Sequence, residues 1–255
     1  MVYLHSLQSE WLKTKRSTSF WICVVGGCFV PLIQMAAFLD KEYSINSFPT
    51  TPGIWQYHYN QMWSTMLSFL LPMTIILFAS LITQLEYKNN TWKQVHTTPQ
   101  SFSMVFFTKL TAIILMVFQF FLFFNIAIIA VGYLSTLIVD GVLPKEHLPV
   151  WIVLKSNAKI FITILPLVAV QYLISLRFKN FLVPVGIGLL MLVAALILAN
   201  LWKYAYLLPA AFCVMNVIPT AQANVPGNYY STAGVYFVII TVLNYLLYIN
   251  RSEKG

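Results

Sequence analysis

Long apolar runs separated by short polar stretches make up most of this chain. Residues 17–39, 110–139 and 180–202 contain no charged side chain. A helix needs about 20 apolar residues to cross the hydrocarbon core of a bilayer, so each run is long enough to span a membrane. The pattern predicts an all-α integral membrane protein with six transmembrane helices, at 18–39, 63–85, 104–138, 157–176, 181–202 and 232–250.

The composition supports the same prediction. Of the 255 residues, 59% are hydrophobic and 9% are charged, whereas a soluble domain carries about 25% charged residues. The chain therefore has too few polar side chains to cover a water-facing surface. Because no soluble domain, internal repeat or low-complexity tract interrupts it, residues 1–255 are expected to form a single transmembrane domain.

The distribution of positive charge predicts the orientation. With six spans both termini lie on the same side, and the flanks on that side carry ten Lys and Arg residues against five on the other. Cytoplasmic flanks carry the excess of Lys and Arg, so both termini are expected to face the cytoplasm. This bias also accounts for the net charge of +8, and no nucleic-acid partner is needed to explain it.

An amphipathic pattern precedes the first span. Leu4, Leu7, Trp11 and Leu12 recur at i, i+3, i+7 and i+8, which places them on one face of a helix. We interpret residues 1–16 as an interfacial helix whose basic end meets anionic lipid. An ordinary positively charged flank is the alternative.

The first external loop, near 40–62, is rich in turn residues and aromatic side chains. Tryptophan and tyrosine are enriched where a membrane meets water. We therefore expect an interfacial aromatic belt, made of Trp55, Tyr57, Tyr59 and Trp63. A substrate-contacting surface is the alternative.

The segment 203–231 is apolar but is broken by Pro209, Pro219 and Pro226. A seventh span there would place the basic C-terminal residues on the wrong side of the membrane. Irregular backbone at membrane depth is tolerated where it is buried in protein or lines a cavity. The segment is therefore expected to form a re-entrant hairpin that dips into the membrane from outside.

The inventory of reactive side chains shows no enzyme active site. None of the seven acidic residues lies inside a predicted span, which argues against a proton- or sodium-coupled carrier because its coupling site needs an ionisable group near the midplane. The sequence has neither the HExxH of a zinc site nor the GxxxxGK[ST] loop that cradles ATP phosphates. No cofactor is expected in this chain.

Four amide side chains lie within predicted spans, namely Gln34, Gln119, Asn125 and Gln171. Amides in a membrane usually form hydrogen bonds between helices, and contact with a substrate is the alternative.

The polar stretch EYKNNTWKQVHTTPQ at 86–100 separates the second and third spans. Within it Tyr87, Thr91 and Val95 share one helix face with Trp92 beside them. A buried aromatic anchor is a common source of binding energy at an interface, and the lysines Lys88 and Lys93 are suited to acidic groups on a partner. From these residues alone, a basic loop with its tryptophan in the lipid interface is an equal alternative.

A more specific pattern runs from this stretch into the next span. It consists of Glu86, Thr91, Trp92, Lys93, Pro99 and Lys109. Together with six spans, an amphipathic first helix and a proline-broken segment before the last span, it resembles the permease subunits of type-2 ABC exporters. The short permeases grouped with lantibiotic protection and bacteriocin immunity are the most similar in kind. The pattern departs from that family at Asn90, where a glycine is common.

The resemblance implies a permease of the bacterial inner membrane that works as a dimer with separate ATPase subunits. ATP and magnesium would be bound by those subunits, and residues 86–98 would form a cytoplasmic coupling helix. The cargo would be an amphipathic peptide or lipid-like molecule, and the dimer could pair two copies of this chain or two related permeases. Two alternatives remain, an ATP-independent channel or carrier and a membrane anchoring or assembly protein.

Overall fold

A computed structural model describes residues 2–15, 17–38, 53–88, 101–138 and 147–252. Every regular element in these ranges is helical. The long helices are α1 (Val2–Lys15), α2 (Thr18–Phe38), α4 (Ile54–Thr65), α5 (Leu71–Lys88), α7 (Phe102–Ile138), α8 (Val150–Arg177), α9 (Leu182–Leu201) and α12 (Tyr229–Ser252). The short ones are η1 (Met66–Leu70), η2 (Ala205–Leu207), α10 (Ala211–Met215) and α11 (Pro219–Gln222).

Six described segments are long and apolar enough to cross a membrane, which confirms the predicted all-helical architecture. They are Thr18–Ala37, Trp55–Gln84, Phe102–Leu134, Val150–Arg177, Leu182–Leu201 and Tyr229–Asn250. The second, third, fourth and sixth begin earlier than predicted, because helix continues through polar and aromatic residues that hydropathy alone leaves outside a span.

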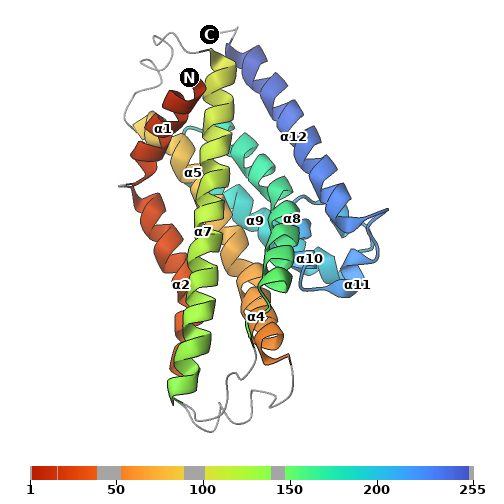
Figure 1. Cartoon of the computed structure of the whole chain (residues 1–255). Coiled ribbons are helices and arrows are strands. Elements are labelled where there is room, and N and C mark those ends of the chain that lie inside the picture. Colours follow the sequence, from red (N-terminus) through yellow and green to blue (C-terminus); the bar gives the residue numbers. More distant parts are fainter. Residues whose placement is uncertain (1, 16, 39–52, 89–100, 139–146, 253–255) are drawn as a thin grey trace.

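Helix α7 is the longest element and forms the axis of the bundle (Figure 1). Helices α1 and α2 pack along one side of it, while α8 packs extensively against both α5 and α12. Both chain termini lie at the same end of the bundle. At this end, which we call the termini end, α1 begins, α5 ends, α7 begins and α12 ends.

The predicted aromatic belt is wrong for three of its four residues. Residues 54–65 form α4, which continues through the π-helical turn η1 into α5. Trp55, Tyr59 and Trp63 are almost completely buried, and only Tyr57 is exposed. Because these three aromatics are spaced four residues apart, they share one helix face, and that face packs against α7. At Gly132 of α7 a Cβ atom would lie 2.5 Å from the Trp55 ring.

The segment before α12 folds back onto the bundle. Residues of α10 are buried against α8, α9 and η1, and the Tyr229 hydroxyl at the start of α12 donates a hydrogen bond to the Phe212 carbonyl oxygen. Gln222 of α11 donates to the Met215 carbonyl oxygen at 2.7 Å. The side-chain bonds replace regular helix where prolines interrupt it. The re-entrant placement of this segment relative to the membrane stays a prediction.

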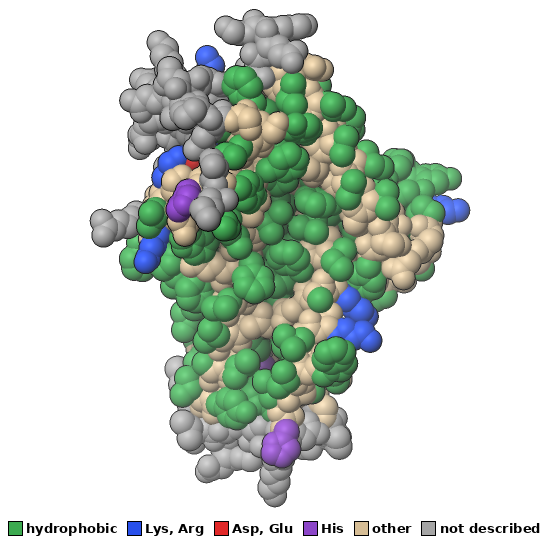
Figure 2. Space-filling model, turned by 45° about the horizontal axis from the view of Figure 1, so that its top comes forward, with side chains coloured by type: hydrophobic (Ala, Val, Ile, Leu, Met, Phe, Trp, Pro, Cys, Tyr) green, Lys and Arg blue, Asp and Glu red, His purple; other side chains and the backbone are tan. Residues whose placement is uncertain are grey.

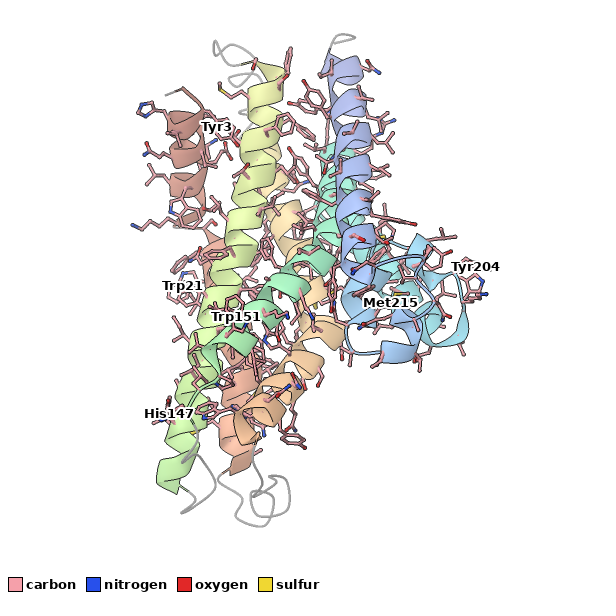
Figure 3. The ribbon with its side chains drawn as sticks, turned by 45° about the vertical axis from the view of Figure 1, so that its right-hand side comes forward. Tyr3, Trp21, His147, Trp151, Tyr204 and Met215 are labelled. Carbon is pink, nitrogen blue, oxygen red and sulfur yellow. The ribbon has the colours of Figure 1, made fainter. Side chains whose placement is uncertain are left out.

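The face of the molecule in Figure 2 is mostly apolar, with its charged side chains at the periphery. Large side chains such as Trp21, Trp151 and Leu190 are more than half exposed. Figure 3 shows Tyr3 and His147 at opposite ends of the bundle, with Trp21 and Trp151 between them. A continuous apolar surface of this kind is what lipid or a second membrane subunit would cover.

Candidate functional site

The predicted coupling residues lie partly outside the described part of the chain. Glu86, Tyr87 and Lys88 belong to the last turn of α5. Thr91, Trp92, Lys93, Val95 and Pro99 lie outside the described residues. What the structure does describe is the pair of helix ends that this stretch connects, and the contacts that hold the first turns of α7.

Helix α1 packs lengthwise against the first half of α7. Near its start, the Tyr3 and Thr111 hydroxyls lie 2.8 Å apart. One α1 face, carrying Ser6, Glu10 and Thr14, is buried. The spacing of four residues places these side chains in one row, so the row pointing toward α7 is polar.

The face of α1 identified from its apolar pattern points elsewhere. Leu4 is 63% exposed and Leu12 is 65% exposed, while Leu7 and Trp11 are half-buried. An outward apolar face suits lipid, and the interfacial position of this helix stays a prediction.

A buried charge cluster fixes α1 to α7. The Lys109 ammonium lies 3.4 Å from Glu10 Oε2, and its side chain is only 1% exposed. The Lys13 ammonium lies 2.6 Å from Glu10 Oε1 and is nearly half exposed. A buried charge is tolerated only when it is paired, which explains why an acidic residue stands on the inner face of α1. Lys109 belongs to the sequence pattern shared with type-2 ABC permeases, but its pairing with Glu10 was not predicted.

The two lysines also set the pKa of the Glu10 carboxyl. Burial by itself raises this pKa, but the charge of Lys109 and the hydrogen bond and charge of Lys13 outweigh burial. The net result is a pKa below the ordinary value of 4.5. The docked helix therefore favours the ionised carboxylate more than the undocked helix does.

Acidification should release α1 from α7. Because the docked carboxyl has the lower pKa, its contribution to docking is complete above the ordinary pKa and is lost as the pH falls through the lowered one. Hydrogen exchange of residues 2–15, corrected for intrinsic rates, should be slow at about pH 7 and should become faster as the pH is lowered below the ordinary carboxyl pKa of 4.5. Unchanged protection at the lower pH would show that the ion pair does not hold the helix.

The opposite side of α7 near its start carries an aromatic cluster that the sequence analysis missed. The Phe106 ring lies 5.2 Å from the Tyr172 ring and 5.5 Å from the rings of Tyr245 and Tyr248. Ser103 Oγ and the Tyr245 hydroxyl are 2.7 Å apart. The one sequence feature that could have indicated this cluster is the pair Tyr245 and Tyr248, which are three residues apart on α12. The first turns of α7 are thus clamped between α1 on one side and α8 and α12 on the other.

Two amides form a reciprocal pair between α7 and α8. Asn125 Nδ2 donates to Asn157 Oδ1 at 3.1 Å, and Asn157 Nδ2 donates to Asn125 Oδ1 at 2.9 Å. The Tyr59 hydroxyl of α4 also donates to Asn125 Oδ1, at 3.1 Å. Asn157 was not among the predicted intramembrane amides, because the fourth span was predicted to begin at this residue. The pair joins three helices through groups that satisfy one another.

The other predicted amides have different surroundings. Gln171 Nε2 donates to the Pro184 carbonyl oxygen at 2.9 Å and to Ser80 Oγ at 3.3 Å, which ties α8 to α9 and α5. Gln34 Nε2 is buried without a hydrogen-bond partner among the described residues. Gln119 lines a cavity.

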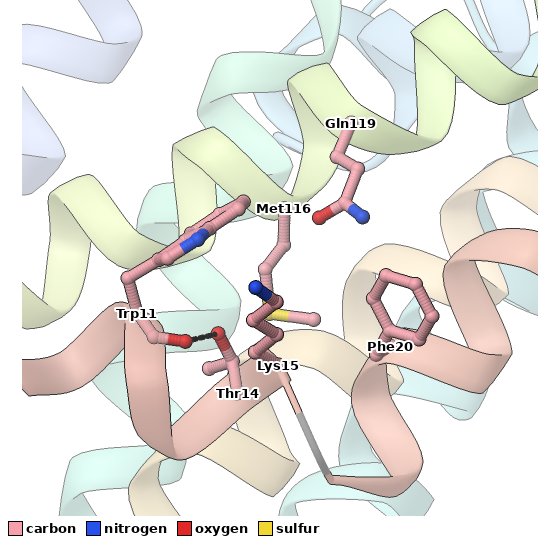
Figure 4. Close-up of a pocket in the computed structure, with 6 residues that line it drawn as sticks. All are labelled: Trp11, Thr14, Lys15, Phe20, Met116 and Gln119. Carbon is pink, nitrogen blue, oxygen red and sulfur yellow. Dashed lines mark hydrogen bonds between the residues drawn. The ribbon is translucent and has the colours of Figure 1, made fainter. Parts of the chain in front are cut away.

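That cavity lies where α1 and α2 meet the side of α7 (Figure 4). Its volume is about 230 Å³. The lining combines aromatic, apolar and polar side chains, from Trp11, Thr14, Lys15, Phe20, Met116 and Gln119. Within the part of the chain that the structure describes, no group of three His, Cys, Asp or Glu residues is placed to hold a metal ion.

Comparison with known families gives one match. The model of a family described as "ABC-2 family transporter protein" matches residues 6–195. No curated protein and no solved structure matches the chain. The matched range runs from α1 to α9 and includes the ion pair, the aromatic contacts of α7 with α8, and the reciprocal amide pair.

Proposed function

Since this chain belongs to the ABC-2 family of transporter proteins, we propose that it is the permease subunit of an ATP-driven exporter of the lantibiotic-protection type. It resides in the bacterial inner membrane with both termini in the cytoplasm. Two permease subunits enclose the substrate route, and separate ATPase subunits bind and hydrolyse ATP. Its cargo is an amphipathic peptide or a lipid-like molecule.

The observation that carries this proposal is the double clamp on the first turns of α7. The 86–98 stretch feeds into this helix, and α7 is tied to α1 through Lys109 and to α8 and α12 through Phe106. A displacement at the stretch would therefore move the two sides of the bundle together. Packed helices shift as units rather than deforming continuously, which suits transmission of force from a soluble motor.

The proposed cargo rests on the polarity of the spans. The described spanning helices carry one acidic residue, Glu86 at the end of α5, and apart from His58 and Lys109 their buried polar side chains are amides and hydroxyls. Such an interior has no fixed negative charge to bind a free cation. The exposed apolar faces of α2, α9 and α12 provide surface for a second permease and for lipid.

Replacing Trp92 by alanine should uncouple the permease from its ATPase. Loss of an aromatic anchor at an interface costs about 2 kcal/mol or more, which corresponds to roughly thirtyfold weaker association. The test is co-purification of the complex in nanodiscs, with ATPase turnover measured on the same samples. Trp151→Ala is the matched control, because Trp151 is 76% exposed and lies away from the termini end.

The expected result is an ATPase subunit that accompanies the wild-type permease and the Trp151 variant but is largely lost from the Trp92 variant. Failure of any ATPase to associate with the wild-type chain would overturn the exporter proposal. Equal association of all three proteins would instead remove the coupling role from this stretch.

A further inference from the structure

The cavity beside α7 is a consequence of the bend between α1 and α2. The chain turns at Ser17, whose backbone N–H donates to the Thr14 carbonyl oxygen at 3.0 Å, and Ser17 Oγ then accepts from the Ser19 N–H at 3.2 Å. The end of α1 and the start of α2 therefore meet at an angle beside α7 (Figure 1). The space left between them is bounded by Met116 and Gln119 of α7.

The lining is chemically divided. Phe20 and Met116 provide an apolar wall, whereas Gln119 and the exposed Lys15 provide an amide and a positive charge. None of the described residues that line the cavity is acidic. Glu10, the nearest acid along α1, is already held by Lys109 and Lys13. An anion placed here would meet Lys15 without competition from a neighbouring carboxylate.

The cavity also adjoins the start of an apolar span. The apolar span of α2 begins at Thr18, only three residues after Lys15, and the end of an apolar span is where headgroups meet hydrocarbon around a membrane helix. Exposed apolar side chains continue from it on both helices, with Trp21 and Val25 on α2 and Phe118 and Leu122 on α7.

Size distinguishes among possible occupants. Pockets for whole drug-sized ligands have volumes of about 300–1,000 Å³, and this one is about 230 Å³. It is too small for an amphipathic peptide, but a glycerophosphate headgroup needs to bury only its polar end there. The acyl chains can then lie on the exposed apolar surface outside.

We propose that the cavity binds the headgroup of an anionic phospholipid from the surrounding membrane. The phosphate pairs with the Lys15 ammonium and accepts from the Gln119 amide, and the acyl chains follow the exposed faces of α2 and α7. The bound lipid stabilises the bend between α1 and α2. This inference goes beyond the proposed function, because lipid binding at this site requires no ATPase and no cargo.

The test uses the full-length permease alone, purified in detergent and titrated with phosphatidylglycerol or phosphatidylcholine while bound lipid is counted by native mass spectrometry. Removing one lysine near an anionic surface should weaken binding about fivefold. Lys15→Gln should therefore retain about fivefold less phosphatidylglycerol. Gln119→Phe, which fills the cavity but keeps the lysine, should lower retention as well. Lys179→Gln is the control, because Lys179 is an exposed lysine between α8 and α9.

Selective retention of phosphatidylglycerol that is lost in both cavity variants and kept in the Lys179 variant supports the site. Equal retention of the two lipids, or equal losses in the Lys15 and Lys179 variants, overturns it. Competition with glycerol 3-phosphate distinguishes a free phosphate site from a lipid site. If a low concentration of this compound displaced phosphatidylglycerol, the acyl chains would have no role in binding. Because no ATPase is present, failure here leaves the transporter proposal untouched.

Discussion

Replacing Glu10 by glutamine should release α1 from α7 and lower the free energy of docking by about 3 kcal/mol. Breaking a buried ion pair by neutralising one partner typically costs about 3–5 kcal/mol, because the other charge stays buried. Glutamine keeps the shape of the side chain, so the change removes charge with little loss of packing. The group that loses its pairing with Glu10 is the Lys109 ammonium, whose side chain is 1% exposed.

Hydrogen exchange of residues 2–15 measures this loss directly, and a decrease of about 3 kcal/mol would raise the opening equilibrium roughly a hundredfold. Lys13→Gln is the internal control. Its ammonium is nearly half exposed, and pairs near the surface contribute about 1 kcal/mol or less. Similar exchange in the Glu10 and Lys13 variants would contradict the buried pair as the main attachment of α1.

A double variant separates the ion pair from simple loss of contact. Lys109→Met alone leaves the Glu10 carboxylate with Lys13, while Glu10→Gln combined with Lys109→Met leaves neither charge of the buried pair. The combined variant should therefore be better protected than the sum of the two single effects predicts. Strict additivity would show that the two residues act on docking independently.

The spans could be predicted from the sequence because the bilayer imposes their length and polarity. Backbone groups in hydrocarbon must be satisfied within the helix, so an uninterrupted apolar run has few alternatives. The 54–65 region lacked such a run. Its aromatics at positions 55, 59 and 63 fit an interfacial belt as well as a helix face, and only the contact with α7 separates the two interpretations.

Polar contacts between helices were harder to predict. An apolar stripe identifies the inner face of a helix in water, yet α1 buries Ser6, Glu10 and Thr14 and exposes Leu4. Lys109 of α7 lies beside Glu10 when the two helices pack. No local pattern in α1 indicates this pairing. The role of residues 86–98 stays a prediction, because it depends on a partner and on residues outside the described ranges.

Substituting Gly188 by alanine should destabilise the bundle by about 2 kcal/mol, while the same change two residues away at Gly186 should not. A Cβ atom at Gly188 would lie 2.6 Å from Gln171 Oε1 and 2.8 Å from Ile76 Cγ2. Overpacking of this kind costs about 1–3 kcal/mol. At Gly186 nothing lies within 4 Å of the added atom, so alanine there should be neutral or should stabilise α9 by up to about 1 kcal/mol.

The cost at Gly188 follows from how tightly Gln171 is held. Its amide donates to Pro184 of α9 and to Ser80 of α5, so it cannot withdraw from a new methyl group without breaking a tie between helices. Thermal unfolding of both alanine variants in the same detergent should give a lower Tm for Gly188→Ala only. Adding Gln171→Ala to that variant should restore less than the full loss, because Ile76 still obstructs the methyl group. Equal Tm values for the two glycine variants would mean that α9 does not approach α5 and α8 as closely as these distances require.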